Sequence, residues 1–291
     1  MRGHSRFDRP GRPVPSAVSP VRLVIAIGLA ALLGGCATPA TPRAAPRPSS
    51  GPVTPAHLSA AQIARLPRAT TFGRLRAGPR DLDASAPTLG VVLHPTATRV
   101  VYARPGGAPV AALPSTELGG PTWVPVVQSR PGWDLVLLPT RPNGSAGWVY
   151  LGGGGLQVAS DSYRIEVNLA GYRLTLTDAG RTLGSWVVAV GAADTPTPTG
   201  QTFLLASAAP VHPTFSPLIL PLGLHSDALD SFDGGPGTVA LHGWPDAAVF
   251  GHPVSHGCVR VPAAALRVLS RVPIGSLVTI IGRPAATSIT G

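Results

Sequence analysis

The chain has 291 residues and is rich in glycine and proline but poor in charge. Gly 35 and Pro 34 together make about a quarter of it, while charged residues make 12% where about 25% is usual. This composition excludes a helical bundle or coiled coil, and 44% hydrophobic residues exclude a wholly disordered chain. We therefore expect an all-β fold with minor helix, in one or two domains.

The formal net charge is +10, and all the basic residues counted in it are Arg. Part of this charge lies in the first 35 residues. No cluster of Arg interleaved with aromatic residues follows, so we do not expect nucleic-acid binding. The two cysteines, Cys36 and Cys258, exclude a disulfide scaffold and a multi-cysteine zinc site.

Residues 1–35 have the layout of a signal peptide, because a basic stretch ending at Arg22 precedes the apolar run 23–33. The run is shorter than the roughly 20 residues of a membrane-spanning helix. Leu33-Gly34-Gly35-Cys36 resembles the bacterial lipobox, which implies acylation of Cys36 and a lipid anchor on the outer face of the plasma membrane. The alternative is a plain secretory signal in which Cys36 is incidental.

Residues 36–85 are predicted to be a linker, since six of the nineteen residues in 37–55 are Pro and favour an extended spacer. Residues 58–66 allow a brief helix before Pro67.

Residues 86–156 are predicted to form a small β module of short strands separated by turns. The expected strands are 91–93, 98–103, 123–128, 133–138 and 147–151. The sequence around Gly132-Trp133 and Gly147-Trp148 resembles bacterial SH3-like wall modules, which implies a small β-barrel. Trp123, Trp133 and Trp148 are a candidate ligand face, although we expect at least two of them to fill the core.

Residues 160–284 are predicted to form a second β domain, followed by a tail at 285–291. The glycine run 152–155 marks the boundary, and period-two alternation begins beyond it. The expected strands are 163–169, 172–177, 183–190, 203–206, 239–241 and 277–281, with one short helix over 262–270.

The segment 241–260 carries the residues that can perform chemistry. A thiol attacks as thiolate, and an imidazole such as that of His242 or His256 can take its proton to give an ion pair at neutral pH. Gly257 beside Cys258 allows backbone N–H groups to face an oxyanion, and the planar cation of Arg260 suits a carboxylate. This set of groups is suited to acyl transfer.

Two other interpretations of this segment stay open on the residues alone. His242, His252, His256 and Cys258 would supply a tetrahedral metal site, although zinc-site spacing is absent and Pro253 disfavours a helix between the histidines. A buried, unreactive cysteine beside unrelated histidines is the other alternative.

His242-Gly243 followed by Ser255-His256-Gly257-Cys258-Val259-Arg260 resembles the signature of the L,D-transpeptidase (YkuD) catalytic domain. The resemblance extends over residues 161–283 and implies a β-sandwich-like catalytic domain that uses neither a metal nor another cofactor. Trp244 stands where a small hydroxyl residue is frequent in the family, and Ala263 where a polar one is.

The resemblance also implies roles for the site residues. Cys258 would be the nucleophile and His242 the proton acceptor and donor, oriented by the backbone carbonyl of Gly243. His256 would shape the site, with the N–H groups of Gly257 and Cys258 as oxyanion donors. Arg260 and Ser255 would contact the peptide substrate.

The implied activity is formation of 3-3 cross-links between peptidoglycan stems, through a thioester on Cys258 and with release of D-alanine. An L,D-carboxypeptidase using the same site and a non-catalytic wall-binding lipoprotein are the alternatives. We expect peptidoglycan stems and the membrane as partners; oligomeric state is not predicted.

Overall fold

The computed structural model describes residues 51, 53–81, 89–212 and 215–283 of the chain. The predicted signal peptide, the lipidation candidate Cys36 and the tail 285–291 lie outside the described residues. None of the helices in the described ranges is long and apolar enough to cross a membrane.

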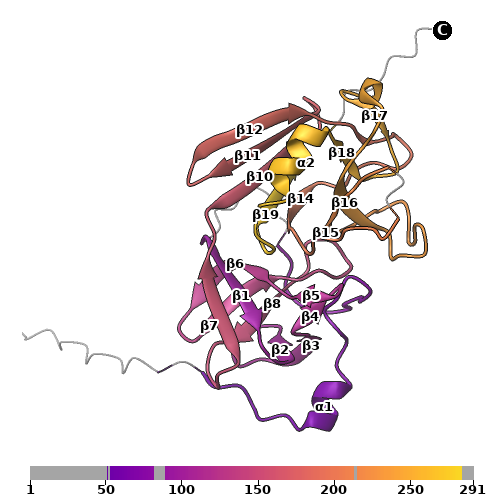
Figure 1. Ribbon diagram of the computed structural model, residues 1–291. Coiled ribbons are helices and arrows are strands. Elements are labelled where there is room, and N and C mark those ends of the chain that lie inside the picture. Colours follow the sequence, from indigo (N-terminus) through magenta and orange to yellow (C-terminus); the bar gives the residue numbers. More distant parts are fainter. Residues whose placement is uncertain (1–50, 52, 82–88, 213–214, 284–291) are drawn as a thin grey trace, which may run out of the picture. The chain divides into compact units, whose positions relative to one another are not determined.

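The described residues up to 160 form α1 and strands β1–β9 (Figure 1). Their bounds are α1 Ala60–Ala64, β1 Val91–Pro95, β2 Arg99–Tyr102, β3 Pro109–Leu113, β4 Thr116–Glu117, β5 Gly120–Pro121, β6 Val124–Arg130, β7 Trp133–Leu137, β8 Ala146–Tyr150 and β9 Leu156–Ser160. Seven of these strands form an antiparallel sheet in the order β3-β2-β8-β7-β6-β1-β9. The five strands that the sequence predicted for this part are present.

The core of this first sheet confirms the prediction that at least two tryptophans are buried. Trp133 is 1% and Trp148 is 5% exposed, and both cluster with Tyr102. The indole N–H of Trp133 donates to the carbonyl of Val53 at 2.7 Å, which satisfies its buried polar atom. A ligand face built from these two indole rings is therefore contradicted.

The structure differs from the predicted boundaries of the linker and of the first module. Ala69, Thr71 and Leu75, inside the predicted linker 36–85, are buried in the described protein. At the other end, β9 pairs with β1 from Leu156 to Ser160, so the first sheet continues beyond residue 156. The sequence did not predict this burial or this strand pairing, because both depend on partners that lie far away in the chain.

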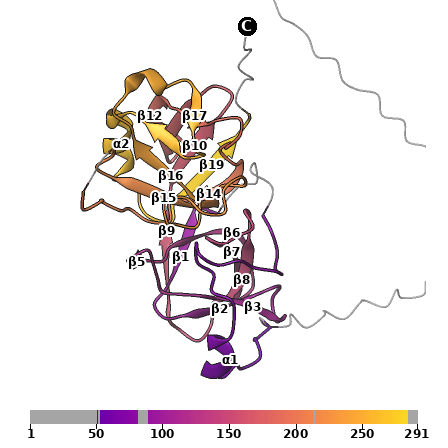
Figure 2. The ribbon, with the colours of Figure 1, turned by 90° about the vertical axis from the view of Figure 1, so that its right-hand side faces the viewer.

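The described residues from 163 onward form strands β10–β19 with two short helices (Figures 1 and 2). Their bounds are β10 Tyr163–Asn168, β11 Arg173–Asp178, β12 Arg181–Val187, β13 Val190–Gly191, β14 Gly200–Phe203, β15 Ile219–His225, β16 Thr238–Gly243, η1 Ala247–Val249, β17 Pro253–Ser255, β18 Val259–Val261, α2 Ala263–Leu269 and β19 Leu277–Ile281. The sheets are β12-β11-β10-β19-β14, β15-β16-β18 and β13-β17. The all-β fold class with minor helix is thereby confirmed.

Helix α2 begins after Pro262, as predicted, because a fixed proline φ suits the start of a helix and its missing N–H costs nothing there. Its Ala265, Leu266 and Leu269 are buried, and the helix packs against β12 and β16. This packing fixes β16, the strand that carries His242.

A buried polar network surrounds His225 at the end of β15. Its imidazole is 0% exposed, and Nε2 lies 2.7 Å from the carbonyl oxygen of Thr71 and 3.0 Å from Thr71 Oγ1. A carbonyl only accepts, so Nε2 carries a proton and donates it to the Thr71 carbonyl. Burial, together with the charges of Arg141 and Arg74, lowers the pKa of His225 to about 4.

We predict that this histidine makes stability depend on pH. In the unfolded chain its pKa is about 6.5. As pH falls from 6.5 to 4, this histidine therefore becomes protonated in the unfolded state while it stays neutral in the folded state. The stability that the neutral His225 contributes above pH 6.5 is lost through that window. The loss approaches about 3 kcal/mol near pH 4, since one pKa unit is worth about 1.4 kcal/mol.

Urea unfolding at pH 7 and pH 4.5 measures this loss. His225→Gln is expected to be less stable than wild type at pH 7 but to lose less stability between the two pH values. Burial raises the pKa of Glu117, so its protonation increases stability as pH falls. This effect is the same in wild type and variant and cancels when their stability losses are compared. An equal loss in both proteins would show that His225 does not titrate with folding.

Candidate active site

The pairing of β16 with β18 brings the predicted catalytic residues to one face. The two strands are parallel, with Leu241 opposite Val259 and His242 opposite Arg260. Side chains alternate along a strand, so His242 and Arg260 share a face with Cys258, which stands two residues before Arg260. Cys258 is therefore one diagonal step from His242, beside the small buried Ala240.

The imidazole of His242 is fixed by a backbone contact. Its Nδ1 lies 2.8 Å from the carbonyl oxygen of Gly243, the contact that the family resemblance predicted. Because the carbonyl only accepts, Nδ1 carries the proton, and Nε2 of the neutral ring keeps its lone pair. This tautomer leaves Nε2 able to accept a proton from a thiol.

The Gly243 backbone is itself held by Ser216. Ser216 Oγ accepts from the Gly243 N–H at 2.8 Å and donates to the Leu218 carbonyl at 2.6 Å. A Cβ at Gly243 would lie 3.0 Å from Ser216 Oγ, so a larger residue would have to displace this hydroxyl by a few tenths of an ångström. Ser216 is thus a positioning residue that acts through the carbonyl holding His242.

Aromatic rings cover the imidazole and exclude water from it. The ring centroids of Phe215 and Trp244 lie 5.0 Å and 6.1 Å from that of His242, which is 7% exposed. Burial lowers the pKa of His242; the Gly243 hydrogen bond opposes this shift and the Arg260 charge adds to it. The imidazole is therefore neutral at neutral pH.

Cys258 is half-buried, and burial raises its thiol pKa. A hydrogen bond from the Ala240 backbone and the positive charge of Arg260 partly oppose this shift. The ion pair expected from sequence is thus disfavoured at rest, because burial raises the pKa of the thiol and lowers that of the imidazole. Both pKa shifts favour a neutral thiol and a neutral imidazole at rest.

The turn before Cys258 is held by hydrogen bonds of Ser255. Ser255 is 2% exposed; its Oγ donates to the Cys258 carbonyl at 2.5 Å and accepts from the Gly257 N–H at 3.1 Å. Ser255 is therefore a buried support for the turn. Of the two predicted oxyanion donors, the Gly257 N–H bonds to Ser255 in this structure.

A threonine-rich loop supports the same turn from outside the signature. Thr197 Oγ1 accepts from the Gly191 N–H and donates to the Gly257 carbonyl, both at 2.8 Å. Thr195 Oγ1 donates to the Ser255 carbonyl at 3.0 Å. The loop 195–200 thereby fixes the backbone on which the nucleophile sits.

Replacing Thr197 with Val tests this support. The change keeps the side-chain shape but leaves the Gly191 N–H and the Gly257 carbonyl without a partner. We expect the free energy of unfolding to fall by about 2 kcal/mol and Cys258 acylation to slow by about tenfold. Urea unfolding and an acylation time course measure the two effects.

Thr199→Val is the matched control, since Thr199 lies in the same loop and is exposed. Its stability is expected to stay within about 0.5 kcal/mol of wild type. Equal effects of the two substitutions would contradict the support assigned to Thr197.

Arg260 and Trp244 form a stacked pair beside the imidazole. The guanidinium carbon lies 3.6 Å from the centroid of the Trp244 ring, and Arg260 is half-buried. Stacking of this kind holds an Arg in place while leaving its N–H edges able to bind a planar anion. Trp244, the departure from the family pattern, thus fixes the cation predicted to contact substrate.

An apolar cavity opens next to these residues. It has a volume of about 370 Å³ and is lined by Phe215, Leu218, Trp244, Pro245 and Leu266, among others. His256, two residues before the nucleophile, is exposed, and its ring centroid lies 5.3 Å from that of Phe232.

Within the described ranges, no group of three or more His, Cys, Asp or Glu side chains is arranged to hold a metal ion. The metal site considered from sequence, with His242, His252, His256 and Cys258, is therefore not formed.

Ser216, Thr197, Phe215 and Phe232 are site residues that no sequence motif indicates. Their partners lie 24 to 60 residues away in the chain. The threonine-proline pattern of 195–200 is typical of a rigid loop but does not indicate what the loop contacts.

One comparison with known families gives a match within the second part of the chain. Residues 162–280 match the family model of the L,D-transpeptidase catalytic domain, YkuD. The match covers less than half of the chain and agrees with the family resemblance of the signature residues. No curated protein matches the chain.

Solved structures of L,D-transpeptidases match this chain with low TM-scores. L,D-transpeptidase 3 from Mycobacterium tuberculosis, in complex with a faropenem-derived adduct, is 12% identical with a TM-score of 0.37, covering 69% of this chain and 100% of that one. An L,D-transpeptidase from Mycobacterium smegmatis is 12% identical with a TM-score of 0.34, covering 52% and 91%. One from Xylanimonas cellulosilytica is 25% identical with a TM-score of 0.31, covering 42% and 62%.

Proposed function

We propose that this protein cross-links peptidoglycan stems as an L,D-transpeptidase, through a thioester on Cys258. The observation that carries the proposal is that His242 on β16 shares a face of the paired strands with Cys258, which directly precedes β18. The Gly243 carbonyl holds the proton on His242 Nδ1, so the lone pair is on Nε2. The family match over 162–280 supports the reaction class.

In the acylation step, Cys258 Sγ attacks the carbonyl carbon of the third residue of a tetrapeptide stem. Its proton passes to His242 Nε2 as the carbon–sulfur bond forms. The imidazolium then protonates the departing amine, so D-alanine leaves and the thioester remains. The positive charge of Arg260 favours this step because it lowers the thiol pKa.

In the second step, the side-chain amine of another stem attacks the thioester. His242 Nε2 takes a proton from that amine and returns it to the leaving sulfur, which regenerates the thiol. The product is a 3-3 cross-link, and the thioester conserves the energy of the cleaved peptide bond. Phe215 and Trp244 exclude water from His242, which favours an amine over water as the second nucleophile.

We further propose that the protein acts outside the plasma membrane, where peptidoglycan stems are found. The proposal rests on the predicted signal peptide and on the resemblance of residues 33–36 to a lipobox. Acylation of Cys36 would anchor the chain, and the proline-rich residues 37–55 would hold the folded part away from the bilayer.

Incubation of the purified protein with disaccharide-tetrapeptides, followed by mass analysis of the products, tests the reaction. The expected product is a 3-3 linked dimer, with one D-alanine released per link. Tripeptide monomers without dimers would identify an L,D-carboxypeptidase instead. Unchanged substrate, with binding to intact cell-wall material, would identify a non-catalytic wall-binding protein.

A further inference from the structure

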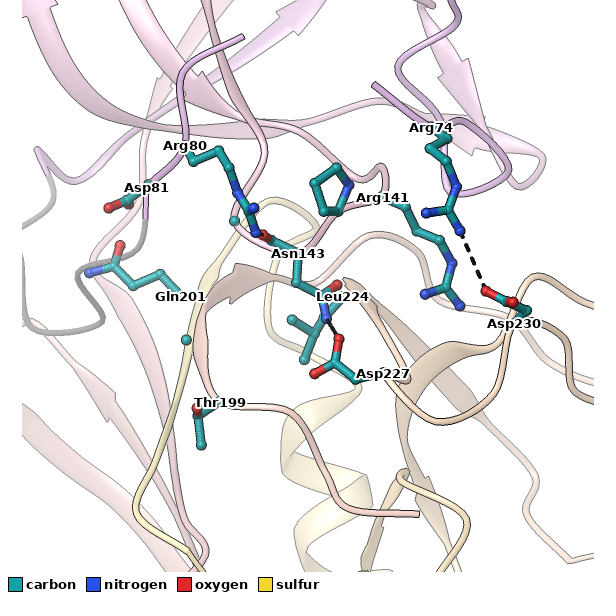
Figure 3. Close-up of a pocket in the computed structure, with 13 residues that line it drawn as sticks. Arg74, Arg80, Asp81, Arg141, Asn143, Thr199, Gln201, Leu224, Asp227 and Asp230 are labelled. Atoms are coloured by element: carbon teal, nitrogen blue, oxygen red, sulfur yellow. Dashed lines mark hydrogen bonds and ion pairs between the residues drawn. The ribbon is translucent and has the colours of Figure 1, made fainter. Parts of the chain in front are cut away.

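We propose that the turn between β7 and β8 positions the active-site loop 226–237, with Arg141 as the positioning residue. The inference rests on the proposed function, because it assigns the first sheet a part in the reaction of the second domain. Figure 3 shows the polar cavity, of about 420 Å³, where this turn meets the loop.

The side chain of Arg141 binds both ends of the loop by donating hydrogen bonds to the backbone carbonyls of the loop. Its Nη1 donates to the Ser226 carbonyl at 2.9 Å, and its Nη2 donates to the carbonyls of Leu229 and Pro236 at 2.9 and 3.0 Å. A planar guanidinium can reach three carbonyls at once, whereas a lysine ammonium on a flexible stem is not pre-organised for this set. Arg141 thereby joins the start of the loop to its end.

Asn143, in the same turn, fixes the residue from which the loop departs. Its Nδ2 donates to the His225 carbonyl at 2.7 Å and to Asp227 Oδ1 at 3.1 Å, and its Oδ1 accepts from the His225 N–H at 2.9 Å. Figure 3 shows the Asn143–Asp227 contact next to Arg141. The β7–β8 turn thus holds the loop through both backbone and side-chain contacts.

Gly237 makes the close approach to Arg141 possible. Its φ is +68°, in the left-handed region that favours glycine. A Cβ at this position would lie 3.0 Å from Arg141 Nη2 and would collide with the Leu229 carbonyl oxygen. The end of the loop is therefore built to receive the guanidinium.

The loop in turn touches the nucleophile's turn. The Phe232 ring stacks on His256, which is two residues before Cys258. A chain of contacts therefore runs from Arg141 through loop 226–237 to His256.

Other hydrogen bonds of the loop are its own: the Ser226 N–H donates to the Gly237 carbonyl at 2.8 Å, and Ser226 Oγ accepts from the N–H groups of Ala228 and Leu229. Residues 227, 228 and 230–234 are exposed, and Phe232 is 50% exposed. A loop with few buried apolar contacts opens at low free-energy cost, so its position depends on the hydrogen bonds at its base. Loss of Arg141 is expected to release Phe232 from His256 and to misalign the substrate at Cys258.

Arg141→Met in the full chain tests the inference. Hydrogen exchange is expected to rise in 226–237 and in 253–258 but not in β10 or β19. The rate of Cys258 acylation by a tetrapeptide stem is expected to fall about 10- to 100-fold, since a displacement of about 1 Å has this effect. Arg141→Lys is expected to recover part of the rate.

Arg74→Met is the matched control. Arg74 lines the same cavity, but its ion pair with Asp230 is 3.4 Å long and exposed on both sides. Such pairs contribute little, so exchange and acylation are expected to stay within about twofold of wild type. Unchanged exchange in 253–258, or an unchanged acylation rate, in Arg141→Met would overturn the inference.

Two further measurements keep the result decisive. If Arg141→Met does not fold, Phe232→Ala tests the far end of the same chain of contacts, and an unchanged acylation rate there overturns the inference. Wild type that leaves stems unreacted contradicts the proposed function, whereas hydrogen exchange still tests the link between Arg141 and the turn at 253–258.

Discussion

Cys258→Ala is expected to abolish both the thioester and the cross-linked product. Removing a nucleophile from a group of residues that act together reduces kcat by a factor on the order of 10⁴ or more. Cys258 is the free cysteine of the described residues, so no neighbouring thiol in those ranges can replace it. Dimer formation from disaccharide-tetrapeptides, followed over hours, measures the loss.

The loss must be separated from a failure to fold. Cys258 is half-buried, and Ala removes one sulfur atom, so we expect the thermal unfolding midpoint to change little. Residual dimer formation within tenfold of wild type in the folded variant would contradict the role of Cys258 as nucleophile.

His242→Gln is expected to reduce the rate of acylation by about 10² to 10⁴-fold, which is the usual contribution of a general acid–base residue. In the proposed mechanism the neutral imidazole accepts the thiol proton, and glutamine cannot. Burial and the Arg260 charge lower the pKa of His242, so wild-type activity should persist below pH 6.5 before it falls as the imidazole is protonated. The variant is expected to lack this acidic decline.

His252→Gln is the matched control, since His252 lies in the same segment and is exposed. Its rate and its acidic decline are expected to match those of wild type. An unchanged acidic decline in His242→Gln would assign the titrating base to another residue.

The sequence predicted the proximity of the signature residues because the signature is local. His242 and Arg260 are paired on two short adjacent strands, and Cys258 directly precedes the second strand, so strand alternation places the three side chains on one face. The sequence also predicted β10 and β11 from their period-two alternation and α2 from the proline at its start.

Other parts of the fold could not be predicted in this way. Strand β15, Ile219–His225, contains Pro221 and Gly223, which weaken a strand pattern, and only its pairing with β16 defines it. The hydrogen bonds of Ser255 within its own turn were not predicted, because the sequence does not indicate whether a polar group faces the substrate or bonds to its own turn. The Arg141 contacts join residues 85 to 95 positions apart, a separation that no local pattern marks.

The central claim, that Cys258 carries the acyl group, is tested most directly by the mass of the intact protein. After brief incubation with a disaccharide-tetrapeptide and acid quenching, wild type is expected to gain the mass of the substrate less D-alanine, and peptide mapping is expected to place it on Cys258. The adduct should disappear with hydroxylamine, which cleaves thioesters. Product formation with the adduct on another residue, or an adduct of equal yield in Cys258→Ala, would contradict the account.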